Sequence, residues 1–223
     1  MKRLKFGFSV VELVVAIAIV GTVALLIVPM SVSAFNKHQS GVVLGRVVEQ
    51  ILQGNQNMLQ LANMNNEDGS YTDELKVLLK KDLYPNTTTN ADENVWENFQ
   101  DYICPYWNLN PTKILSNQVI NIKKFNGAYD NTITPVKYIT DTNCHRFDFK
   151  NFIASVAIYR TNNKWFIYVD TTGLTNPPNI LGKDIFAFEL NNDGTLRPFE
   201  ADDSNGLQYT EQVVREGFRI TYY

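Results

Sequence analysis

Few residues of this chain have the types and spacing that an active site requires. The only two histidines are His38 and His145, and the chain contains no His-Glu-x-x-His pair, no phosphate-binding glycine loop and no nucleophile elbow. Cys144 directly precedes His145, which makes a cysteine nucleophile with a histidine base the one candidate pair. In an exported protein, however, two cysteines pair with each other first. We therefore predict no catalytic residues and no enzymatic activity, and we expect His145 at the surface.

Cys104 and Cys144 are the only two cysteines. In a reducing compartment they would be two unrelated thiols, whereas in an exported protein two and only two cysteines usually form one disulfide. A bridge between them would close a loop of about 40 residues and contribute about 4 kcal/mol in the chain-entropy model. Because the N-terminal segment indicates export, we predict the Cys104–Cys144 bridge.

A third group of polar residues lies between Asp170 and Asp184. This segment combines oxygen-bearing Thr and Asn side chains with turn-forming Gly and Pro, as calcium-binding loops do, although the spacing is not that of an EF-hand. The alternative is structural, with Asp170 and Asp184 capping strand ends and accepting hydrogen bonds from N–H groups of the loop. We prefer the structural interpretation and predict no cofactor, with calcium as the alternative.

Glu12 is the most unusual acidic residue, because it lies beside a long run without any charge. The run Leu13–Phe35 contains 23 residues, and as a helix it would span about 35 Å, slightly more than the hydrocarbon core of a bilayer. Three basic residues among the first five predict a cytoplasmic N-terminus and an exported remainder. A carboxylate in a membrane helix costs a few kcal/mol, so such residues are usually functional.

Two simpler interpretations of this segment do not require Glu12. One is a cleaved secretory signal peptide, for which Val32-Ser33-Ala34 offers a cleavage site of small residues. Its apolar region would nevertheless be far longer than the usual length of about 7–15 residues. The other is a plain membrane anchor.

The stretch Gly7-Phe8-Ser9-Val10-Val11-Glu12 and the apolar run after it resemble the class III signal of type IV prepilins and type II secretion pseudopilins. In that family a dedicated peptidase removes a short basic leader after the glycine, and the new N-terminal residue is N-methylated. The resemblance covers only the N-terminal part of the chain. It implies cleavage after Gly7, methylation of Phe8, and pairing of Glu12 with the N-terminal amine of a neighbouring subunit in a filament.

Pro29 also matches a proline that is common in the N-terminal helix of this family. Proline has no N–H group, so a helix here would lack the hydrogen bond to the carbonyl of Leu25, and Gly21 weakens the same region. Either Pro29 only kinks the helix, as prolines in membrane helices often do, or it permits local stretching when subunits pack in a filament. The sequence favours neither alternative.

The hydrophobic periodicity predicts the elements that carry these residues. An amphipathic pattern continues beyond the apolar run and predicts one helix from Phe8 to about Ala62. Two short helices are expected at 73–81 and 96–103, the second ending at Cys104-Pro105, and a helical turn at 210–216. The period changes to that of strands near residue 118. The predicted strands are 119–125, 134–139, 155–160, 165–170, 184–190, 195–199 and 218–223. Helices followed by strands predict an α+β fold with a mostly antiparallel sheet, which is also the architecture of the family.

The predicted organisation has three parts: a cleaved leader at 1–7, a transmembrane and assembly helix at 8–35, and an exported head at 36–223 that includes the amphipathic half of the helix. The formal net charge is −3, and without residues 1–7 the chain keeps 17 basic and 23 acidic residues. No basic excess indicates a nucleic-acid partner.

The resemblance implies a structural subunit of a type IV pilus or related filament, held in the inner membrane by a single span with its head outside the cytoplasm. Its partners would be itself, other pilin-like subunits and the prepilin peptidase. The length of the processed chain favours a minor subunit over a major one. The alternatives are a type II secretion pseudopilin and a membrane-anchored binding module or enzyme.

Overall fold

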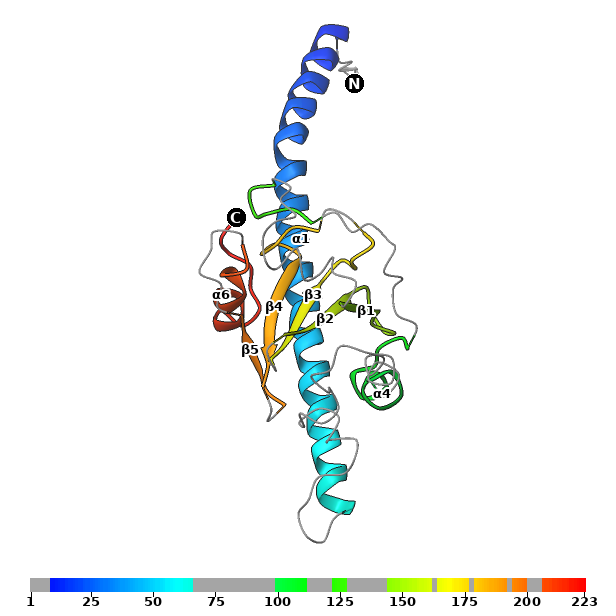
Figure 1. Ribbon diagram of the computed structural model, residues 1–223. Coiled ribbons are helices and arrows are strands. Elements are labelled where there is room, and N and C mark those ends of the chain that lie inside the picture. Colours follow the sequence, from blue (N-terminus) through cyan, green and yellow to red (C-terminus); the bar gives the residue numbers. More distant parts are fainter. Residues whose placement is uncertain are drawn as a thin grey trace, which may run out of the picture.

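A computed structural model describes residues 9–65, 99–111, 122–127, 144–161, 164–176, 179–191, 194–199 and 206–223. A long helix runs through the molecule and a small sheet lies against its middle (Figure 1). The elements in chain order are the helix α1 (Val10–Asn65), the π-helix η2 (Phe99–Ile103), the helix α4 (Cys104–Trp107), the strands β1 (His145–Asp148), β2 (Ser155–Thr161), β3 (Lys164–Asp170), β4 (Ile185–Leu190) and β5 (Leu196–Pro198), and the helix α6 (Tyr209–Arg215).

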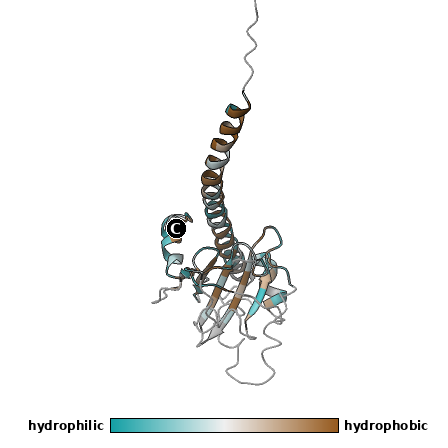
Figure 2. Cartoon of the chain, turned by 90° about the horizontal axis from the view of Figure 1, so that it is seen from above, coloured by the Kyte–Doolittle hydropathy of each residue, from teal (hydrophilic) through white to brown (hydrophobic). Residues whose placement is uncertain are grey.

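The helix α1 confirms the single long helix expected from the sequence and divides into two halves of different character. Its N-terminal half projects away from the head and is hydrophobic, whereas more hydrophilic residues accompany the half beside the head (Figure 2). In this second half one face is fully buried, at Leu44, Val47 and Ile51, and it ends in the buried Met58. The helix is therefore at once the projecting segment and a structural part of the head.

The five strands form one antiparallel sheet in the order β1-β2-β3-β4-β5, so each strand pairs with its neighbours in sequence. The hairpin of β2 and β3 lies where the sequence predicted it, and the pairing of Thr161 with Lys164 leaves two residues for the turn. The turn before β5 is also as expected, because the Gly194 N–H donates to the Asn191 carbonyl at 3.0 Å. A long helix on an antiparallel sheet confirms the predicted α+β fold class.

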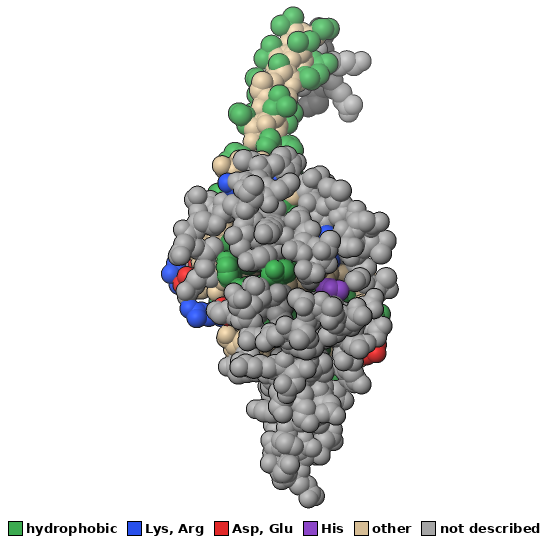
Figure 3. Space-filling model, viewed as in Figure 1, with side chains coloured by type: hydrophobic (Ala, Val, Ile, Leu, Met, Phe, Trp, Pro, Cys, Tyr) green, Lys and Arg blue, Asp and Glu red, His purple; other side chains and the backbone are tan. Residues whose placement is uncertain are grey.

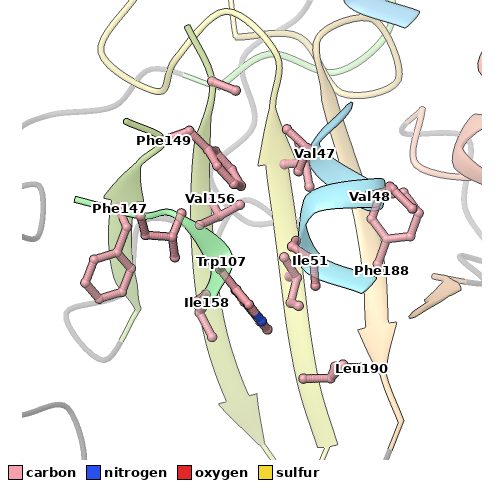
Figure 4. Close-up of a cluster of buried hydrophobic side chains, with 14 of the residues drawn as sticks. Val47, Val48, Ile51, Trp107, Phe147, Phe149, Val156, Ile158, Phe188 and Leu190 are labelled. Atoms are coloured by element: carbon pink, nitrogen blue, oxygen red, sulfur yellow. The ribbon is translucent and has the colours of Figure 1, made fainter. Parts of the chain in front are cut away.

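Alternating residues of the strands bury two faces of the sheet. One face packs against α1, and Figure 4 shows Val156 and Ile158 of β2 and Phe188 of β4 around Val47 and Ile51 of the helix. The opposite face forms a second cluster, whose members from the strands are Ala157, Phe166, Tyr168, Ile185 and Ala187. Such alternation is what a sheet buried on both sides requires, since successive side chains point in opposite directions.

Several predicted elements differ from the structure. The helical segment after Phe99 does not end at Cys104-Pro105, because Pro105 lies in the first turn of α4, where a missing N–H is tolerated. Residues 218–223 form no strand. Within the predicted strand 119–125 the described residues form only a single bridge, between Lys123 and Ile180. The predicted helix 73–81 and strand 134–139 lie outside the described residues.

Gly54 permits α4 to approach α1 closely. A Cβ atom at this position would lie 2.7 Å from the Tyr106 carbonyl oxygen and 2.9 Å from the ring of Trp107. Trp107 is itself fully buried, and its ring N–H donates to the side-chain oxygen of Asn55 at 2.8 Å. The amide of Asn55 in turn donates to the Gly194 carbonyl at 2.6 Å, so this buried contact joins α1, α4 and the turn before β5.

Replacing Gly54 by Ala should therefore destabilise the head, even though alanine is the better helix former by about 1 kcal/mol. Overpacking of this kind costs about 1–3 kcal/mol, because the clash is with backbone and with a buried ring. The free energy of unfolding of the full chain in detergent, followed by tryptophan fluorescence, measures this loss. Gly21→Ala is the matched control, since nothing lies within 4 Å of a Cβ there, and equal effects of the two substitutions would contradict the prediction.

Candidate functional site

The start of α1 is closed by a reciprocal pair of hydrogen bonds between Ser9 and Glu12. The Ser9 N–H donates to the Glu12 carboxylate at 2.8 Å, and the Glu12 N–H donates to the Ser9 hydroxyl at 3.2 Å. The Leu13 N–H donates to the Ser9 carbonyl at 3.1 Å, which places Ser9 at the N-cap position. These contacts form a capping box, which satisfies two N–H groups that a helix start would otherwise leave without acceptors.

Glu12 therefore has a local role in capping α1, in addition to the role that the resemblance implies. Its carboxylate lies in the first turn of α1, where the helix dipole favours a negative charge, and its side chain is exposed. An intrasubunit cap and an intersubunit ion pair are compatible, because a carboxylate accepts several hydrogen bonds. Gly7 and Phe8, the residues of the predicted processing site, lie outside the described residues.

Pro29 lies inside α1, and the helix continues through it without interruption. The structure thus has no local melting at Pro29 in the isolated chain. Thr22, one turn after Ala18, donates its hydroxyl to the carbonyls of Ala18 and Ile19 at 3.1 and 2.9 Å, so this polar side chain is satisfied within the apolar segment.

The projecting half of α1 exposes apolar side chains on all sides. Val20, Leu25 and Met30 are 68, 76 and 74% exposed, and hydrophobic side chains cover the projecting helix in Figure 3. Soluble monomers rarely expose a contiguous apolar surface of this size, which marks an interaction site with lipid or with another protein. Among the described residues α1 is the one helix long and apolar enough to cross a membrane. The chain thus combines a pilin-like architecture with one apolar N-terminal helix.

The expected bridge between Cys104 and Cys144 is wrong, since the structure holds no disulfide between them. Cys104 is buried in the cluster between α1 and the sheet, and Cys144 is buried in the cluster on the opposite face. The two cysteines thus belong to different buried clusters. Burial raises the pKa of the Cys104 thiol to about 12, which disfavours the thiolate form.

Asp170 and Asp184 come together at the ends of β3 and β4. Asp170 accepts hydrogen bonds from the N–H and the hydroxyl of Thr172 at 2.8 and 2.9 Å, while Asp184 accepts from the N–H of Ile180. Both carboxyl groups are buried, and burial raises the pKa of Asp170 to about 7 and that of Asp184 to about 6. The carboxylate of Asp184 raises the pKa of Asp170 further.

Hydrogen bonds from the same loop favour a structural role of these residues over the calcium site that the sequence offered as an alternative. Calcium requires six to eight oxygen ligands, about 2.3–2.6 Å away. Here N–H groups of the same loop point at both carboxyl groups, which is the structural alternative. No group of three or more His, Cys, Asp or Glu side chains that could hold a metal occurs in the part of the chain that the structure describes. The second oxygen of Asp170 is buried without a hydrogen-bond partner, which favours the neutral acid.

His145 was expected at the surface but is 8% exposed, in the first position of β1. It follows Cys144 directly. His38 is exposed on α1, three residues beyond Phe35, as expected for a residue just outside the apolar run.

No protein-family model, curated protein or solved structure matches this chain. The site therefore has to be interpreted from its own geometry. The capping box is the functional feature that the sequence interpretation missed, although the pattern Ser9-x-x-Glu12 before an apolar run is its usual signal.

Proposed function

We propose that this protein is a pilin-like structural subunit of a type IV pilus or a related filament. The observation that carries the proposal is the exposed apolar half of α1, which continues without a break into the core of the head. A simple anchor needs only the apolar half. Because the same helix also packs in the core of the head, the position of each head is fixed relative to the packing of the apolar halves. A filament of repeated subunits requires such a fixed geometry.

In this proposal the apolar half first spans the inner membrane, with the head outside the cytoplasm, and then packs against the same half of other subunits. Its partners are copies of itself, other pilin-like subunits and the peptidase that removes the leader. No catalytic role is assigned to the chain. A type II secretion pseudopilin would use the same helix in the same way.

Processing of the N-terminus tests the proposal directly. The membrane-extracted chain should begin at Phe8 and carry one added methyl group at its amine, as intact-mass and peptide mass spectrometry would show. A chain that begins at Phe35 would establish an ordinary signal peptide, and one that keeps residues 1–7 would establish a plain anchor. Gly7→Leu should retain the leader, whereas Gly21→Leu, the same change inside the apolar run, should be processed normally.

A further inference from the structure

A groove with a volume of about 760 Å³ separates α1 from the loops of the head at the point where the apolar half ends. One wall comes from the helix and the other from loops of the sheet. The helix contributes Val28, Val32 and Asn36 to the groove, and the head contributes Ile153, Lys183 and Tyr223. Ile153 is 69% exposed and is the large hydrophobic residue that the described part of the head presents most openly to solvent.

The charge pattern of α1 indicates where this groove would lie relative to a bilayer. Val28 and Val32 belong to the uncharged run, and Lys37 is the first charged residue after Glu12. If the run spans a bilayer, its last turns lie at the boundary between hydrocarbon and headgroups. The loop residues across the groove then lie at the same boundary, because they face the same helical turns.

The residues beside the groove have the chemistry of a membrane interface. The ammonium group of Lys37 lies 4.4 Å from the centre of the Tyr223 ring, and that of Lys183 lies 4.9 Å from the same ring and 4.9 Å from the ring of Phe125. Tyr222 stacks on Tyr209 with ring centres 4.0 Å apart. Tyrosines and snorkelling lysines are the residues that soluble domains and membrane helices place at the headgroup layer.

The charged side chains around the Tyr223 ring are basic. Lys37 and Lys183 are half-buried, with both ammonium groups held around one ring. The acidic residue among the groove-lining residues is Asp184, which is buried and hydrogen-bonded to its own loop. Two ammonium groups beside an exposed isoleucine are complementary to a bilayer surface, where a layer of phosphate groups lies above hydrocarbon. Basic side chains are visible in Figure 3 directly below the apolar helix, where it meets the head.

We propose that this membrane-facing patch, made of Lys37, Lys183 and Tyr223 and bordered by Ile153, rests in the headgroup layer of the leaflet from which α1 emerges and prefers anionic phospholipids. The proposal rests on the proposed function in one respect, namely that the apolar run spans the membrane. It adds that the head is held against the bilayer before assembly rather than tethered freely above it. Entry into a filament then requires release of the patch from lipid.

The test uses the full chain reconstituted in single-copy nanodiscs that contain anionic phospholipid and a lipid with a nitroxide on its headgroup. A fluorophore on Ile153→Cys should be strongly quenched, and one on Thr195→Cys should not. Thr195 is exposed and follows Gly194, which contacts Asn55. Asn55 lies about 28 Å further along the helix than Asn36. The native cysteines do not compete for the label, because both are buried.

Charge removal separates adhesion from mere tethering. Lys37→Gln with Lys183→Gln should lower the ratio of membrane-bound to released heads by about 30-fold, because each basic residue near an anionic surface contributes to binding. Quenching at position 153 should decrease accordingly. Zwitterionic discs should have the same effect on the native chain. Arg46→Gln with Arg197→Gln removes the same net charge elsewhere and should leave the quenching unchanged.

Unchanged quenching in the double lysine variant would overturn the proposal, since proximity alone would then account for the signal. Equal quenching at positions 153 and 195 would overturn it as well, as would quenching that appears only when two chains share a disc. A fluorophore on Val20→Cys reports the spanning helix through a lipid with a nitroxide in its acyl chain. Loss of that signal would overturn the proposed function together with this inference, whereas its presence without quenching at position 153 would overturn this inference alone.

Discussion

Replacing Asp170 by Asn should make the head more stable at pH 8 and leave its stability near pH 4 almost unchanged. Asp170 is fully buried, and one of its oxygens has no hydrogen-bond partner. Asn has the same shape, keeps an oxygen that accepts from Thr172, and carries no charge. The substitution therefore removes the charged form, which is the form that burial disfavours.

The direction of the pH dependence follows from the raised pKa values. The pKa of Asp170 is about 7 and that of Asp184 about 6 in the folded head, against an ordinary value of 3.8. At a pH between the ordinary value and the raised values, both carboxyl groups have lost their protons in the unfolded chain but keep them in the folded head. The contribution of these two carboxyl groups to stability is therefore fully present below about pH 4 and is lost as the pH rises towards 7. Each pKa unit corresponds to about 1.4 kcal/mol, so the loss is large enough for denaturant unfolding to detect.

Denaturant unfolding of the full chain in detergent at a series of pH values measures both effects. Asp101→Asn is the matched control, because Asp101 is exposed and the chemical change is the same. A native stability that increases from pH 5 to pH 8 would contradict the prediction. Bound calcium would also give the reverse result, with added calcium stabilising the native chain at pH 8 and Asp170→Asn abolishing that gain.

The elements that the sequence predicted correctly are those whose buried residues recur at the regular spacing of one helix or one strand. The long helix and the hairpin of β2 and β3 bury regular faces, so their spacing is visible in the chain. β1 was missed because its residues include His145 and Arg146, which are polar and yet buried. Its strand conformation comes from pairing with β2, in which Arg146 lies opposite Ala157. No local property of these residues indicates that pairing.

The cysteines show a second kind of limit. Their number indicated a bridge, but whether they can meet depends on which face of the sheet each one reaches. Cys144 precedes β1, and a shift of one residue in a strand moves a side chain to the other face. Cys104 belongs to the helical segment on the α1 side. The spacing of the cysteines does not indicate which face of the sheet each side chain reaches. The spacing of Ser9 and Glu12, in contrast, does indicate a capping box, which the interpretation of Glu12 as an assembly residue overlooked.

Glu12→Gln should leave the chain inserted and processed, and should reduce its entry into filaments by a factor of about 100 or more. The amine of a processed Phe8 is mostly protonated at neutral pH. If Glu12 of a neighbouring subunit is its partner in the apolar bundle, its removal leaves a buried charge alone, at a cost of about 3–5 kcal/mol. Each 1.4 kcal/mol is a factor of ten in population.

The capping box makes this substitution more discriminating than its chemistry alone suggests. Gln also serves at the third position of a capping box, so Glu12→Gln removes the charge and keeps the cap. Ser9→Ala does the opposite, since it removes the hydroxyl acceptor and keeps the charge, at a cost of about 1 kcal/mol to the helix start. Sheared filaments and membranes, fractionated and quantified for each variant, separate the two roles. Pairing predicts that Ser9→Ala assembles nearly normally and Glu12→Gln does not. The reverse pattern would reduce Glu12 to a helix cap, because only the loss of the cap would then matter.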